Sequence, residues 1–284
     1  NVHTYFWGIA FNGSLTGAWI LDWAVAMNDA TSIPDVSSLS YGLPEIATCP
    51  SPNTAGLPCG NAYYSRTNTE LVKLCTRGSS VVVCSQDAGA TADGHGSNNC
   101  DLHPEFPATS PWVTTVGSTV PSNRAPARPN VDSIGEAAVS PADGTVWTTG
   151  GGFSSIPANA RPSYQNTAVE KYLATAKNLP TGLFNASGRA YPDVAMVGSN
   201  YPIQAGGPIL PLGDGTSSST PIFSAAVTLL NQARAEAGKG PLGFLNIMLY
   251  KFAETHPEVF YDVTVGSNRC GEFLCCPHGY DTAV

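Results

Sequence analysis

Apolar positions along the chain form two kinds of run, and the two kinds alternate. Runs typical of β-strands cover residues 4–11, 36–42, 79–89 and 111–120, and the run at 79–89 is the continuous apolar type that is buried on both faces. Runs with helical spacing lie between them, at 16–29 and 65–78. On the first of these, one face would carry Ile20, Trp23, Ala24 and Met27. This alternation predicts βα units with a mostly parallel sheet, which is an α/β fold.

The second half of the chain is less regular. Residues 122–162 show no clear period and are predicted to be irregular, and the cysteine-rich last twenty residues are predicted to be loop. The longest helix is expected over 217–237, and a shorter one should follow 241–246. In the earlier helix at 65–78, Ser65 or Thr67 can serve as the N-cap and Gly78 can end it.

Composition narrows the class of protein. Only 12% of the 284 residues are charged, the net charge is −8, and the 13 basic residues form no run, so nothing favours nucleic-acid binding. The longest apolar stretch falls short of the 18 residues or so that a membrane-spanning helix needs. The opening residues have the pattern of a strand and differ from a signal peptide.

Cysteine usage indicates an oxidising compartment. The eight cysteines lack the paired spacing of zinc sites. Cys49 and Cys59 flank a proline-rich loop that a disulfide can close, whereas Cys75 and Cys84 are equally well explained as free buried thiols. Two glycosylation sequons, at Asn12 and Asn185, agree with a secretory route.

The stretch GDGTSSSTP at 213–221 is the first candidate for chemistry. Ser217 stands where the chain enters the long helix, and a helix N-terminus supplies free amides and positive dipole to a developing oxyanion. The plainer interpretation is an ordinary serine N-cap. From this local pattern alone, both interpretations stay open.

Two strand ends offer a second group of residues. Asp87 follows the apolar run at 79–86, and Ser40, Tyr41 and Gly42 follow another. Ligands of parallel sheets bind beyond the carboxyl ends of the strands, so these residues can share a cleft. The simpler alternative is that Asp87 closes a turn. A Ser-His-Asp triad using Asp87 and His95 is disfavoured, because both residues lie in one short loop instead of on separate sheet elements.

Taken in order, ten short motifs resemble the sedolisin family of serine-carboxyl peptidases, and within it the lysosomal tripeptidyl peptidases. They are SLSYG, RTNTELVKL, VVVCSQDAG, PEFPATSPWVTTVGST, GGGFS, RPSYQ, FNASGRAYPDVA, GDGTSSSTPIF, PLGFLN and FYDVT. The resemblance covers nearly the whole chain. It implies a subtilisin-like three-layer fold in which helices cover both faces of the sheet.

The resemblance also implies roles. Ser217 matches the family nucleophile, Asp87 matches the aspartate of the oxyanion hole, and Ser40, Tyr41 and Gly42 match the strand end that pairs with substrate. The family's general base is a glutamate oriented by a second aspartate. A carboxylate base stays competent in acid, where histidine is protonated, and a carboxyl group can donate to an oxyanion only when neutral. An acid optimum and a lysosome-like or acidic extracellular setting are therefore expected.

A calcium ion is implied as well. Family members bind calcium through two aspartates and backbone carbonyls, and the matching positions here are Asp262, Val263, Pro277, Gly279 and Asp281. Oxygen ligands suit a hard cation. The family commonly has glycine where Pro277 stands, which a carbonyl ligand tolerates. The alternative is a pair of solvent-facing loop aspartates.

Family analogy also pairs the later cysteines. It ties Cys100 to the 270–276 cluster, and Cys270 then pairs with Cys275 or Cys276, adjacent cysteines having separate partners.

The sequence also departs from the family. In the family, the catalytic glutamate and its partner aspartate lie four residues apart on a helix that precedes the strand at 4–11, and the chain continues past the GYD at 279–281 into a final helix. Residues 1–284 are therefore expected to be a partial peptidase domain, truncated at both ends and inactive and poorly folded alone. Asp22 is a poor substitute, because Ala18 stands four residues before it and a solvated stripe with Asp29 explains it better. A non-catalytic secreted relative is the alternative function, and the partners expected are peptides or proteins and a pro-segment.

A smaller departure lies beside the nucleophile. Asp214 stands where the family usually has serine, so its carboxylate either points away from the oxyanion hole or is protonated at working pH.

Overall fold

A five-stranded sheet lies at the centre of the computed structural model, which describes residues 3–6, 18–45, 60–91, 100–127, 134–204, 206–207, 209–270 and 275–281. Four of its strands run parallel, in pairs β1 with β3, β3 with β5 and β5 with β9. The fifth strand, β6, is antiparallel to β5. The strands span Val36–Leu39 (β1), Ser80–Cys84 (β3), Thr114–Ser122 (β5), Gly135–Ala138 (β6) and Val194–Val197 (β9). The predicted mostly parallel sheet is confirmed.

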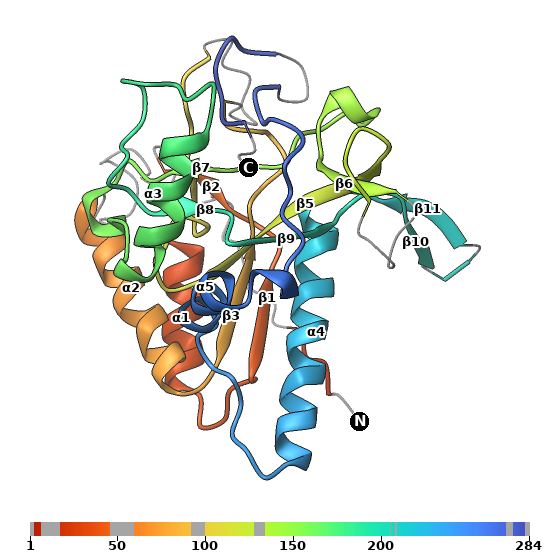
Figure 1. Ribbon diagram of the computed structural model, residues 1–284. Coiled ribbons are helices and arrows are strands. Elements are labelled where there is room, and N and C mark those ends of the chain that lie inside the picture. Colours follow the sequence, from red (N-terminus) through yellow and green to blue (C-terminus); the bar gives the residue numbers. More distant parts are fainter. Residues whose placement is uncertain are drawn as a thin grey trace.

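Helices cover both faces of this sheet (Figure 1). Helices α1 (Trp19–Asp29) and α2 (Asn61–Thr76) lie on one face, and α4 (Thr216–Glu236) lies on the other. Successive residues of β3 separate the two layers: Val81 and Val83 pack in the cluster of α1 and α2, and Val82 packs with Val227 of α4. Because side chains of a strand alternate between faces, a wholly apolar strand must be buried on both sides.

Shorter elements complete the fold. The described residues also form helices α3 (Asn166–Thr175) and α5 (Asn246–Thr255) and four single-turn 3₁₀ helices, at 141–143, 157–159, 163–165 and 257–259. Three small antiparallel pairs join β2 (Leu43–Pro44) to β4 (Glu105–Phe106), β7 (Gly152–Phe153) to β8 (Ala190–Tyr191), and β10 (Tyr201–Gln204) to β11 (Ile209–Gly213). Strands β6 and β7 show that the irregular structure predicted for 122–162 was wrong in part.

The start of α2 differs from the sequence prediction. The helix begins at Asn61, a full turn before Ser65, so neither Ser65 nor Thr67 is its N-cap. The Thr67 hydroxyl instead donates to the Tyr63 carbonyl inside the helix, at 2.9 Å. Tyr63 and Tyr64 are buried in the core, and their packing stabilises a helical turn that precedes the polar residues Ser65 and Thr67.

Several other predictions concern the chain's ends and its cysteines. Residues 3–6 are not in a strand, and the rest of the strand predicted at 4–11 lies outside the described residues, as do Cys49 and Cys59. Disulfides join Cys100 to Cys276 and Cys270 to Cys275, which confirms the expected link of Cys100 to the 270–276 cluster and decides between the two partners left open for Cys270. Cys75 and Cys84 are free thiols. None of the helices in the described ranges has the length and apolarity to cross a bilayer.

Candidate active site

The ends of β1 and β3 meet the beginning of α4, and the predicted catalytic serine lies at this junction. The Ser217 hydroxyl donates a long hydrogen bond of 3.4 Å to the Ser40 carbonyl. In return, the Ser40 hydroxyl donates to the Ser217 carbonyl, also at 3.4 Å. Both side chains are exposed. The structure therefore brings the predicted nucleophile to the predicted substrate-binding strand end, 177 positions away in the chain.

Asp87 reaches the same junction from the end of β3. Its Oδ1 atom accepts two hydrogen bonds from Thr216, one from the backbone N–H and one from the hydroxyl, both at 2.7 Å. Thr216 is the first residue of α4 and directly precedes Ser217. The Oδ2 atom lies beside Gly215, where a β-carbon would approach it to 2.9 Å. Because Oδ1 already accepts two hydrogen bonds from Thr216, Oδ2 is the oxygen available to bind a ligand.

Backbone hydrogen bonds hold the turn that carries Asp87. Gln86 has a φ of 73°, in the left-handed region that few side chains adopt, and its carbonyl accepts from the Gly150 N–H at 2.7 Å. The Asp87 carbonyl accepts from the Thr148 N–H at 3.2 Å, and the Thr148 carbonyl accepts from the Gly89 N–H at 3.0 Å. A left-handed non-glycine residue persists only where its surroundings enforce it, so this turn is rigidly specified.

The other two residues of the predicted substrate strand differ in exposure. Tyr41 is 41% exposed, and its ring meets Trp19 edge-on with the ring centroids 5.6 Å apart. Gly42 is buried, and a β-carbon there would lie 2.7 Å from the Gln86 amide nitrogen and 2.9 Å from the Phe106 carbonyl. Glycine is therefore required where the strand passes the Asp87 turn.

The other acidic residues considered from the sequence face elsewhere. Asp22 and Asp29 are exposed on α1, as expected for a solvated stripe. The Asp214 carboxylate accepts from the Ser199 hydroxyl at 2.6 Å and from the Asn200 N–H at 2.9 Å, so it points toward the turn between β9 and β10. This is the first of the two alternatives for Asp214. His95 lies outside the described residues.

The residues matched to a calcium site are only partly gathered. Asp262, Val263 and Asp281 line one cavity of about 410 Å³. Among the described residues, the buried Oδ1 atom of Asp281 has no hydrogen-bond partner, and an oxygen of this kind suits a hard cation. Pro277 and Gly279 are not among the residues lining that cavity. In the described ranges no three His, Cys, Asp or Glu side chains form a metal-binding group.

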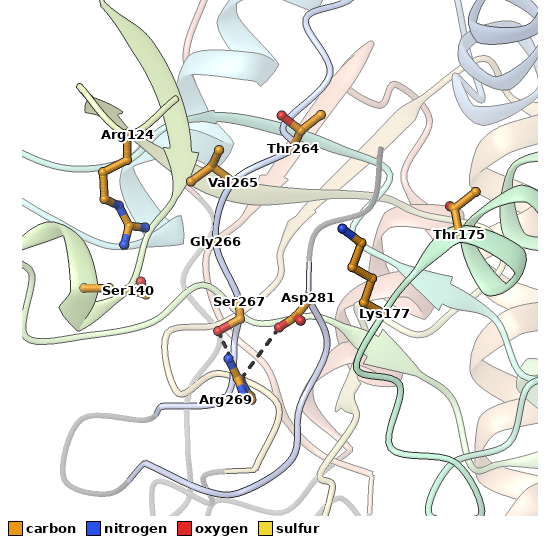
Figure 2. A pocket seen from close by; sticks show the side chains of 11 residues that line it. Arg124, Ser140, Thr175, Lys177, Thr264, Val265, Gly266, Ser267, Arg269 and Asp281 are labelled. Atoms are coloured by element: carbon orange, nitrogen blue, oxygen red, sulfur yellow. Dashed lines mark hydrogen bonds and ion pairs between the residues drawn. The ribbon is translucent and has the colours of Figure 1, made fainter. Parts of the chain in front are cut away.

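Basic residues lie on the other side of Asp281. It also borders a second cavity of about 520 Å³, together with Lys177, Arg124 and Arg269. Figure 2 shows Arg269 turned toward Ser267 and Asp281, and its Nε atom lies 3.7 Å from Asp281 Oδ1. The positively charged Arg269 guanidinium therefore lies next to the Asp281 carboxylate, which is one of the proposed calcium ligands.

Sequence reasoning missed several contributors to the site. Thr216 was hidden because a threonine before a serine-rich helix start resembles any N-cap sequence. Thr148 and Gly150, which hold the Asp87 turn, lie in the region predicted to be irregular. The triple glycine at 150–152 was the available signal, because glycines permit close backbone approach: a β-carbon on Gly150 would lie 1.8 Å from the Ser85 carbonyl.

Comparison with known proteins finds relatives that align with almost the whole of this chain. Physarolisin of Physarum polycephalum is 35% identical over 99% of this chain, which covers 50% of that protein. Tripeptidyl-peptidase 1 of Homo sapiens is 35% identical over 92% of this chain, which covers 42% of it. The chain therefore spans about half the length of these curated relatives, or less. No protein-family model matches.

The solved structures give the same answer for the fold. Pseudomonas sedolisin, described as a serine-carboxyl proteinase complexed with two molecules of pseudo-iodotyrostatin, matches with a TM-score of 0.62 at 20% identity. The match covers 93% of this chain and 66% of that one. These 284 residues are therefore homologous in sequence to physarolisin and tripeptidyl-peptidase 1, and they share the fold of Pseudomonas sedolisin.

Proposed function

We propose that this chain carries the nucleophile and oxyanion-hole half of an acid-acting serine-carboxyl peptidase. One observation carries the proposal: the Asp87 carboxylate bonds to Thr216, which places it one residue from Ser217 at the start of α4. A nucleophile, a carboxyl group and a helix N-terminus thus lie together at the strand ends, as acyl transfer requires.

Each step of the reaction then has a residue. The Ser217 Oγ atom attacks the carbonyl carbon of the scissile peptide bond while its proton passes to a carboxylate base. The new oxyanion accepts a hydrogen bond from Asp87, which acts in its protonated form and so requires acid. Collapse expels the amine and leaves an ester on Ser217, which water then hydrolyses. Peptide substrate runs along Ser40–Gly42 and pairs with its backbone.

The base is expected from outside the described residues. Asp214 is bonded to Ser199 and Asn200 and so is not presented to Ser217, while Asp22 lies exposed on α1. In the described ranges the Ser217 hydroxyl donates to a backbone carbonyl instead of a carboxylate. The family's glutamate, oriented by its aspartate, would complete the site in the intact protein.

Calcium is the cofactor that the resemblance implies, and the shared cavity supports it in part. Asp262, Asp281 and the carbonyl of Val263 would hold the ion, with Pro277 and Gly279 as further carbonyl ligands. When bound, the ion would supply charge neutralisation that fixes this loop to the rest of the domain. Sequons and disulfides further support a secreted or lysosome-like acidic location for the protein.

The test is peptide hydrolysis by the intact protein that contains this sequence. We expect cleavage in acid. Two substrates are compared: a peptide blocked at both ends, which only an endopeptidase can cleave, and a tripeptide amide with a free N-terminus, which a tripeptidyl peptidase can cleave. A peptide aldehyde should inhibit the enzyme by forming a reversible adduct with the Ser217 hydroxyl. Ser217→Ala should abolish turnover, whereas Ser218→Ala, a matched change one residue away, should keep it.

The opposite result has a clear meaning. If the folded intact protein hydrolyses neither substrate between acid and neutral pH and binds no aldehyde, it is the non-catalytic relative, and the peptidase proposal is wrong.

A further inference from the structure

Residues 267–270 and 275–281 return to the active-site region, and Asn268 among them contacts the chain just after the Asp87 turn. The Ala90 N–H donates to the Asn268 carbonyl at 2.9 Å, three residues beyond Asp87. The Cys100–Cys276 disulfide fastens the same segment to the chain that follows the turn. The closeness is extreme at Gly89, where a β-carbon would lie 2.7 Å from the Asn268 carbonyl.

Asn268 is the residue at the centre of this contact, and its polar groups are all occupied. Its side-chain amide nitrogen donates to the Gly151 carbonyl at 3.0 Å, and its side-chain oxygen accepts from the Tyr280 N–H at 2.8 Å. Its backbone N–H donates to the Tyr280 carbonyl at 3.0 Å. The residue is only 7% exposed. A buried amide bonded in this way fixes the relative position of the three segments that it joins.

Two of those segments border the proposed catalytic site. The Asp87 turn is bonded to Thr148 and Gly150, and Gly151, the next residue, is bonded to the Asn268 side chain. Asn268 thus touches the turn at Ala90 and its support at Gly151. Displacement of Asn268 would move both sides of the Asp87 turn together.

We propose that Asn268 is a positioning residue that sets the placement of the Asp87 carboxyl group at the oxyanion. The inference rests on the proposed function, because it assigns a role within that site. Asn268 touches no reacting atom. Its effect passes through the Ala90 N–H and the Gly151 carbonyl to the backbone of the turn. A group that stabilises only the oxyanion contributes to the transition state, so its misplacement should lower kcat and leave KM almost unchanged.

The experiment uses the intact enzyme and compares two buried asparagines. Asn268→Ala should lower kcat about 10- to 100-fold with KM within about threefold, because misplacement of a catalytic group by about 1 Å has effects of this size. Asn246→Ala is the matched control: Asn246 is also buried and bonds Val113 at 2.9 Å and Thr114 at 2.7 Å. The control should lose thermal stability and keep its kcat.

A peptide aldehyde supplies a readout that loss of stability does not move. Its adduct on Ser217 carries an oxyanion, so Asn268→Ala should weaken aldehyde inhibition by the same factor as kcat/KM, while a non-reactive peptide alcohol binds as before. Asn268→Ser, which puts a small polar hydroxyl in place of the amide, serves where the alanine variant does not fold, and it should show a smaller loss of the same kind.

The possible failures are distinguishable. An inactive wild-type protein overturns the proposed function itself. An active wild type whose Asn268 variants, folded by circular dichroism, keep kcat and aldehyde affinity, or change them no more than Asn246→Ala does, overturns only the positioning role.

Discussion

The carboxylate of Asp87 is bound to Thr216 by two hydrogen bonds of equal length, 2.7 Å, from the backbone N–H and from the hydroxyl. The two residues are 129 positions apart, and Thr216 opens the helix whose next residue is Ser217. Ser217, the proposed nucleophile, therefore directly follows Thr216, which orients the Asp87 carboxyl group proposed to bind the oxyanion. Motion of α4 relative to β3 would disturb both at once.

Thr216→Val should impair turnover through this contact. Valine preserves the shape and the backbone bond but removes the hydroxyl donor, so the Asp87 carboxyl gains rotational freedom. We expect kcat to fall about 10-fold, less than the loss of a donor that touches the oxyanion directly. Steady-state kinetics of the intact enzyme in acid would measure it.

Two companion variants give this prediction its control. Thr216→Ser retains the hydroxyl and should keep most of the activity. Thr220→Val removes a buried hydroxyl one turn later, which donates to the Thr216 carbonyl at 2.7 Å without touching Asp87. If Thr220→Val were as slow as Thr216→Val, the contact with Asp87 would not be the cause.

The candidate site shows what sequence can and cannot supply. Ser217, Asp87 and Ser40 could be singled out because each stands at the end of a strand or the start of a helix, but only the family resemblance assigned roles to them. Their proximity follows from parallel-sheet topology, which sequence also predicts. Thr216, Thr148 and Asn268 were not found, because their roles come from contacts between segments far apart in the chain.

The fold divides in the same way. The β3 run was predicted because burial on both faces leaves a continuous apolar sequence, and the 216–236 helix because its length outweighs local noise. Strand β7 has two residues, and its pairing with β8 depends on a partner nearly forty positions away. No local period can encode so short a strand.

Gly215→Ala should damage both stability and catalysis. Gly215 has a φ of 113°, which side chains rarely adopt, and the new β-carbon would approach Asp87 Oδ2 to 2.9 Å. We expect a loss of about 1–3 kcal/mol in unfolding free energy from the backbone alone, together with lower kcat. Gly240→Ala is the control, because no described residue other than its two chain neighbours lies within 4 Å of the added carbon. Equal urea midpoints for the two variants would contradict the prediction.

Glu105 should make the fold more stable in acid. It is 5% exposed, and burial, followed by the nearby charge of Glu45, raises its pKa from 4.5 to about 8. Between these values the unfolded chain releases a proton that the folded chain keeps. This contribution to stability is therefore fully present below about pH 4.5 and is lost as the pH rises to about 8. An acid-acting enzyme would work where the contribution is largest.

Glu105→Gln tests this pH dependence. The amide stays neutral, so the variant should gain on the order of 1–3 kcal/mol relative to wild type near pH 8 and almost nothing in strong acid. Urea unfolding across the pH range is the measurement, and Glu236→Gln on the exposed face of α4 is the control. Parallel stability curves for wild type and Glu105→Gln would show that this carboxyl does not titrate differently on folding.

A buried ion pair away from the catalytic junction should govern stability without governing chemistry. Arg189 and Asp193 have fully buried side chains 2.5 Å apart. Asp193 also accepts from the Thr115 N–H at 2.7 Å and from the Tyr250 hydroxyl at 2.9 Å, which ties β5 and α5 to the turn between β8 and β9. Arg189→Met leaves the carboxylate buried without its partner, so we expect a loss of about 3–5 kcal/mol in unfolding free energy.

A double variant distinguishes the net contribution of the ion pair to the unfolding free energy from the cost of leaving one buried charge without its partner. Arg189→Met with Asp193→Leu removes both charges and should recover much of the stability lost by Arg189→Met alone, because an apolar replacement of similar volume avoids desolvating the ions. In every variant that folds, kcat per folded molecule should match wild type, since neither residue contacts Asp87 or Ser217. A double variant no more stable than Arg189→Met would mean that the pair's hydrogen bonds to β5 and α5, and not its charge balance, hold this part of the fold.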